Sequence, residues 1–149
     1  MKGDPLPDAD HIVRYCKSTT VPNGQIQATA FMLRLGDEAL SVNWLECLHC
    51  ESRQDEISEI RNLYRAKFDR VGAGARIAVL NVGGVCEEIR ENSEDARELR
   101  IAHDPDDGVT GSSGIADPSH SGIYNPRDDD DLIAEMICSR ILEDYPARS

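Results

Sequence analysis

Residues 76–82 read RIAVLNV, and this stretch decides the fold. It is the longest apolar run that lies between helical patterns, and Gly83 and Gly84 end it. A short continuous apolar run between turn signals is typical of a strand that is buried on both faces. We therefore expect a central strand here, with the neighbouring helices packed against its sheet.

Helical periodicity occurs on both sides of this strand. Residues 52–70 place apolar side chains three and four positions apart with charges between them, Ser52 being the expected N-cap and Asp55 lying in the first turn. Residues 131–142 form a second amphipathic pattern, and a short helix is expected around residues 85–91. The apolar stripes of the two main helices consist of Ile57, Ile60, Leu63, Tyr64 and Phe68 in the first and Leu132, Ile133, Met136, Ile137 and Ile141 in the second.

Strand signals come first along the chain, and helices then alternate with strands. This order predicts an α+β fold, with a mixed sheet of about five to six strands packed against two main helices. Two prolines and two aspartates in residues 1–9 predict a flexible N-terminal arm, so residues 10–149 form a single domain. Besides the segment already quoted, the expected strands are 12–16, 30–35, 40–45, 99–103 and 121–124.

The composition excludes several classes of partner. The chain has 149 residues and a net charge of −12, from 16 Lys and Arg against 28 Asp and Glu. It lacks the positive footprint that nucleic acids require, and anionic membranes repel it. No apolar run is long enough for a membrane span or a signal peptide, so we expect a cytoplasmic protein with its five cysteines reduced. The expected partner is a protein with a basic surface.

Two short polar motifs near the C-terminus are the first candidate site. His103-Asp104-Pro105 and Asp117-Pro118-Ser119-His120 flank a loop rich in Gly, Ser and Asp over residues 104–118. Their histidines and carboxylates could bind a divalent metal or act as a general acid and base. Asp-Pro is also an ordinary turn dipeptide, which leaves a purely structural role open.

A second candidate lies near the N-terminus, where His11 precedes Arg14 by three residues. Arg14 could hold a phosphate or a carboxylate through two parallel hydrogen bonds. The alternative is a surface arginine that pairs with one of the many acidic residues. Cys47 and Cys50 have the spacing of zinc and redox sites, but no second ligand pair accompanies them. We therefore expect no metal and no cofactor.

Taken together, the motifs resemble those of a loose group of uncharacterised small bacterial proteins. The resemblance implies an organisation, without an activity, in which His11, Arg14, Ser41 and His120 belong to one polar site. The full set of candidate catalytic residues is then His11, Arg14, Ser41, His103, Asp117 and His120. The motifs that carry the resemblance are Asp8-x-Asp10-His11-x-x-Arg14, Ala30-Phe31-x-x-Arg34, Leu40-Ser41-Val42, His103-Asp104-Pro105 and Asp117-Pro118-Ser119-His120-Ser121-Gly122-Ile123.

Two classes of function follow. In the first, the chain is an accessory or partner-binding component of a multi-protein bacterial system. In the second, it is a small enzyme, either a metal-assisted hydrolase or a nucleotide-using transferase, with a polar site of His, Arg and Asp. Convergence of His11, Arg14, Ser41 and His120 in one cleft favours the enzyme, and scattered side chains favour the binding protein.

Overall fold

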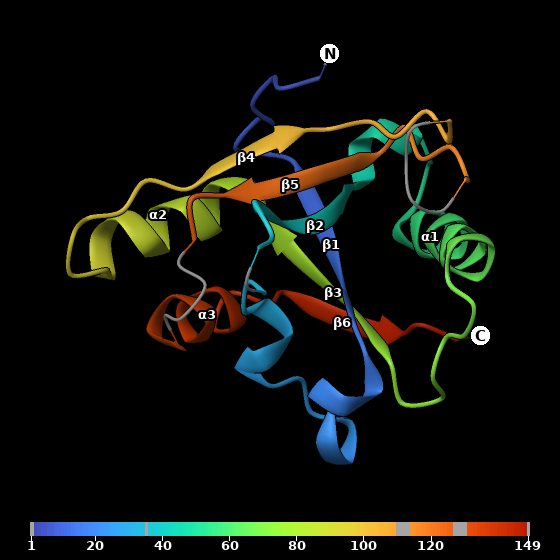
Figure 1. Ribbon diagram of the computed structural model, residues 1–149, viewed down its shortest axis with the longest axis horizontal. Helices are drawn as coiled ribbons and strands as arrows, with labels where there is room; N and C mark the ends of the chain where they lie inside the picture. Colours follow the sequence, from blue (N-terminus) through green and yellow to red (C-terminus); the bar gives the residue numbers. More distant parts are fainter. Residues whose placement is uncertain (1, 35, 110–113, 127–130, 149) are drawn as a thin grey trace.

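The computed structural model describes residues 2–34, 36–109, 114–126 and 131–148. Within them the chain forms one six-stranded sheet in the order β4-β5-β2-β1-β3-β6, with three α-helices (Figure 1). The strands are β1 (His11–Cys16), β2 (Ala39–Trp44), β3 (Arg76–Asn81), β4 (Arg100–His103), β5 (His120–Tyr124) and β6 (Glu143–Pro146). The helices are α1 (Arg53–Lys67), α2 (Val82–Asn92) and α3 (Asp131–Cys138).

The predicted α+β class is confirmed, and the quoted stretch forms β3. Ile77, Val79 and Leu80 are fully buried, so this strand is covered on both faces as expected. Successive side chains of a strand point to opposite faces. Ile77 and Val79 accordingly join the core beneath α1, whereas Ala78 and Leu80 join the larger core beneath α2 and α3.

The helices cover both faces of the sheet. Helix α1 lies on one side, and α2 and α3 lie on the other (Figure 1). The predicted N-cap of α1 is present, because the Ser52 hydroxyl accepts a hydrogen bond of 3.1 Å from the backbone N–H of Asp55. Helix α2 begins directly after β3, where the Asn81 side chain accepts a bond of 2.8 Å from the backbone N–H of Gly84.

The direction of the strands differs from the prediction. Every pairing between named strands is antiparallel, whereas a mixed sheet was expected. Burial on both faces is usual for parallel strands, but here it results from helices that cover both faces of an antiparallel sheet. The apolar run of residues 76–82 therefore predicts that β3 is buried, but it does not predict whether the adjacent strands run parallel or antiparallel to it.

One expected strand is replaced by another. In the segment 30–35, of which residue 35 lies outside the described part, Ala30 and Phe31 end a 3-10 helix, Ala28–Phe31, and both are buried. The sixth strand is β6, whose sequence EDYP has no apolar alternation. It pairs with β3 through the backbone, and an ion pair between Arg76 and Asp144 joins the two strands.

Residues 2–9, the described part of the expected arm, run beside β4. The backbone N–H of Gly3 donates to the His103 carbonyl at 2.6 Å, and that of Leu6 donates to the Ile101 carbonyl at 2.9 Å. The Leu6 side chain is buried in the larger core. This segment therefore covers the outer edge of the sheet.

The sheet opens between β1 and β2. Strand β1 pairs with β3 along its whole length, but its pairing with β2 covers only Ile12 with Trp44 and Val13 with Asn43. From Arg14 onwards the two strands separate. The functional site described next lies at this separation.

Candidate functional site

A pocket of about 1250 Å³ opens where β1 and β2 separate. It extends from these strands to the C-terminal end of α1, and we call it the Arg14 pocket. Its charged and polar lining includes Arg14, Lys17, Arg34, Ser41, Lys67, Arg70 and His120, and its aromatic lining consists of Tyr15, Tyr64 and Phe68.

Two backbone carbonyls hold the Arg14 side chain in the gap between the strands. Its Nε donates to the Ala30 carbonyl at 2.9 Å, and its Nη1 donates to the Ser41 carbonyl at 2.8 Å. The guanidinium has five N–H donors, and the two protein hydrogen bonds that hold it in the described part of the chain use Nε and Nη1, not Nη2. Arg14 is partly buried and lowers the cost of separating β1 from β2 by satisfying a carbonyl that faces the gap.

The surroundings of Arg14 are basic, whereas the chain as a whole is acidic. Among the described residues no carboxylate lies within ion-pair distance of the Arg14 guanidinium. Its burial lowers the pKa of Arg14 below the ordinary value, since a partly desolvated cation is less stable than one in water. Among the described residues, five Lys and Arg residues line the Arg14 pocket, but only three acidic residues do, namely Asp37, Asp69 and Asp106. The lining of the Arg14 pocket is therefore basic, although the protein as a whole is acidic.

Behind this pocket, Asp117 is fully buried and fully hydrogen-bonded. Its Oδ2 accepts from Lys67 Nζ at 2.8 Å and from Asn43 Nδ2 at 2.9 Å, and its Oδ1 accepts from the Ser119 hydroxyl at 2.9 Å. Burial opposes ionisation of this carboxyl, but the bonds from Lys67, Asn43 and Ser119 outweigh it, so the pKa of Asp117 is lowered. Asp117 is thus a buried carboxylate that positions Lys67 at the pocket wall.

Three aromatic residues, Tyr15 of β1 with Tyr64 and Phe68, form an aromatic wall of the pocket. The Tyr15 and Phe68 ring centroids are 4.7 Å apart, and the Tyr64 and Phe68 rings stack at 5.3 Å. The Tyr64 hydroxyl donates to Asn43 Oδ1 at 3.5 Å, and burial raises the pKa of Tyr64, which therefore stays neutral. The aromatic wall gives the pocket an apolar side beside its cations.

The two histidine motifs interlock through the backbone. His120 Nδ1 lies 2.8 Å from the Asp104 carbonyl, and His103 Nε2 lies 2.7 Å from the Pro118 carbonyl. Because a carbonyl only accepts, each of these nitrogens carries a proton. His120 lines the Arg14 pocket, whereas the His103 ring packs edge-on against Trp44 at 5.1 Å.

The candidate residues from the sequence therefore converge only in part. Arg14, Ser41 and His120 line one pocket, and Asp117 supports its wall through Lys67. His11 lies outside it, where its Nδ1 meets Glu46 Oε2 at 2.8 Å. His103 is also outside the pocket lining and braces the connection between β4 and β5.

Lys67, Asn43 and Tyr64 belong to the site but were not among the candidates that the sequence indicated. The spacing of Tyr64 and Lys67 could have indicated that these two residues lie together, because they are three positions apart in α1 and share a helix face. A lysine in the last turn is usually solvent-facing and attracted by the helix dipole, so its role was not visible. Asn43 gave no signal, because polar residues at alternate positions are usual in a strand with one buried face.

Two further kinds of site chemistry, metal binding and disulfide formation, concern the His, Cys and acidic side chains of the described residues. In the described ranges no group of three or more His, Cys, Asp or Glu side chains is arranged to hold a metal ion. All five cysteines are free thiols, and those of Cys47 and Cys50 donate to the carbonyls of Pro118 and Leu48.

No helix in the described part of the chain has the length and apolar character needed to cross a membrane. Comparison with protein-family models, curated proteins and solved structures finds no match to this chain.

Proposed function

We propose that this protein binds a small anionic molecule, carrying a phosphate or a carboxylate group, in the Arg14 pocket. The observation that carries the proposal is the Arg14 guanidinium, which two carbonyls fix in place and which has no carboxylate partner among the described residues. A partly buried cation without a counter-charge is costly, and a bound anion removes that cost.

The geometry of Arg14 suits an anion that enters from the pocket. Its Nε and Nη1 are occupied by protein carbonyls, which leaves the Nη2 side for a ligand. Lys17 and Arg34 line the same pocket and add positive charge. The aromatic wall of Tyr15 and Phe68 provides an apolar surface for the uncharged body of the ligand.

His120 supports an enzymatic form of this proposal. Its Nδ1 proton is directed to the Asp104 carbonyl, so the neutral ring has Nε2 as its acceptor. An imidazole with a fixed tautomer beside a bound anion is suited to accept a hydrogen bond or a proton from the ligand. Arg14 would hold the anionic group, and His120 would act on the adjacent part of the ligand.

The test is a titration of the protein with inorganic phosphate and with acetate, followed by two-dimensional NMR of backbone amides and arginine Nε–H groups. Shifts that saturate and cluster around Arg14, Ser41 and His120 support the proposal. Shifts spread evenly over surface lysines and arginines, or no saturation, contradict it.

A second candidate function is association with a basic protein partner. Outside the Arg14 pocket lining, the described residues include 22 acidic and 10 basic ones. The remaining surface is therefore strongly acidic, which favours fast association with a positive surface. Sedimentation with cytochrome c as a basic probe tests it, and a complex that is lost at physiological salt argues against a specific partner role.

A further inference from the structure

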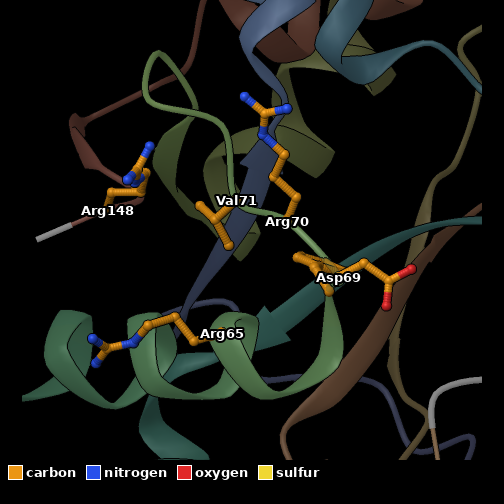
Figure 2. A pocket seen from close by; sticks show the side chains of 6 residues that line it. Arg65, Asp69, Arg70, Val71 and Arg148 are labelled. Atoms are coloured by element: carbon orange, nitrogen blue, oxygen red, sulfur yellow. The ribbon is translucent and has the colours of Figure 1, made fainter.

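A second, smaller pocket lies next to the Arg14 pocket. Its volume is about 530 Å³, and its lining consists of Arg65, Phe68, Asp69, Arg70, Val71 and Arg148 (Figure 2). Arg65 belongs to α1, Arg70 and Val71 follow that helix, and Arg148 lies near the C-terminus. We call it the Arg148 pocket.

The two pockets are adjacent. Phe68, Asp69 and Arg70 line both of them, so the segment that leaves α1 forms their shared wall. Only the segment 68–70 therefore lies between a molecule bound at Arg14 and the Arg148 pocket.

The Arg148 pocket is also cationic. It has three arginines and one carboxylate, and the Asp69 carboxylate points away from Arg65 and Arg148 (Figure 2). In the part of the chain that the structure describes, none of the three arginines forms an ion pair. The guanidinium groups of Arg65 and Arg148 extend to the same side of Val71 (Figure 2).

Among the described residues, the two linings together hold seven basic residues and three acidic ones, and of the seven only Lys67 has an ion-pair partner, the buried Asp117. A single phosphate or carboxylate needs far fewer cations than this, since one arginine fork holds one such group. The excess of cations is divided between two adjacent pockets, with Arg14 in one and Arg65 and Arg148 in the other.

We infer that the ligand carries at least two anionic groups, of which Arg14 binds one and the pair Arg65 and Arg148 binds another. The inference rests on the proposed function and specifies its substrate class, a small molecule with several phosphates or an equivalent series of anions. Phe68 and Arg70 contact the part of the ligand between the two groups.

The experiment is calorimetric titration of the full chain with inorganic phosphate, tripolyphosphate and a longer linear polyphosphate. Linking anions that occupy both pockets raises the affinity by roughly one hundredfold or more over phosphate alone. In the double variant Arg65→Gln/Arg148→Gln this gain is lost and the affinity for phosphate is unchanged. Both side chains are exposed, so the variant keeps its fold.

The matched control is Arg90→Gln, which removes an exposed arginine of α2 that lies outside both pockets. It should lower polyphosphate affinity less than twofold. An affinity that does not rise with chain length, or a rise that the double variant retains, overturns the inference. If phosphate itself fails to bind at Arg14, the proposed function fails instead, and that result is distinct.

Discussion

Lys67 at the end of α1 forms an ion pair with Asp117, whose carboxylate is fully buried, and the two atoms Nζ and Oδ2 are 2.8 Å apart. The pair links the helix that covers one face of the sheet to the residues just before β5. An isolated antiparallel bridge between Asp106 and Asp117 holds the backbone at the same point. Lys67 and Asp117 therefore fix one wall of the Arg14 pocket.

Removal of the lysine alone should destabilise the fold strongly. Lys67→Met leaves the Asp117 carboxylate buried without its cation, and we expect the free energy of unfolding to fall by about 3 kcal/mol. Urea denaturation measures the loss. The control is Lys17→Met, which changes an exposed lysine of the same pocket and should cost less than about 0.5 kcal/mol. Equal losses in the two variants would contradict the structural role of the pair.

Acid should weaken the protein through Asp117. The pKa of this carboxyl is lowered in the folded state, from about 3.9 in an unfolded chain. Its contribution to stability is therefore present above that unfolded pKa and is lost as the pH falls through the lower folded pKa. Asp117→Asn should show a smaller loss of stability between about pH 5 and about pH 2 than the natural chain. If the free energy of unfolding fell equally with pH in the two proteins, Asp117 would make no such contribution.

His103 and His120 should contribute equally to stability but differ in their contribution to anion binding. His120→Ala and His103→Ala each remove one hydrogen bond to a carbonyl and should each lower the free energy of unfolding by about 1 kcal/mol. Only His120 lines the Arg14 pocket, so only His120→Ala should weaken anion binding. Thermal denaturation with and without phosphate measures both effects. A similar loss of binding in His103→Ala would remove the basis for a role of His120.

Cys16 should be chemically inert in the folded protein. Burial raises its pKa to about 12, so almost no thiolate exists near neutral pH. Iodoacetamide followed by mass spectrometry should label Cys47 in the native protein and Cys16 only after unfolding in urea. Cys16→Ser identifies the peptide. Labelling of Cys16 at the rate of Cys47 would contradict its burial.

The sequence contained most of the fold because burial leaves a local pattern. The run 76–82 and the stripe Ile57, Ile60 and Tyr64 indicated β3 and α1, and Ser52 marked where α1 begins. Strand β6 left no such pattern, since it is an edge strand without apolar alternation that is held to β3 by backbone pairing and by the ion pair between Arg76 and Asp144. The antiparallel direction of the sheet also has no local signature in a strand buried on both faces.

The site was less visible because its groups come from distant parts of the chain. Arg14, Ser41 and His120 were candidates, but their proximity depends on the separation of β1 from β2, which no pattern of single residues reports. Lys67 and Asn43 became visible only through their contacts with Asp117. The net charge of −12 concealed the basic lining, because composition averages over the whole surface.

Calorimetric titration with inorganic phosphate of the natural chain, Arg14→Lys and Arg34→Gln tests the central claim most directly. Arg14→Lys keeps the charge but cannot hold two carbonyls and an anion together, so its affinity should fall about tenfold or more. Arg34→Gln removes an exposed charge from the same pocket without changing the fold. The affinity of this variant for phosphate should fall less than that of Arg14→Lys. Phosphate binding of equal affinity in all three folded proteins would contradict an anion site at Arg14.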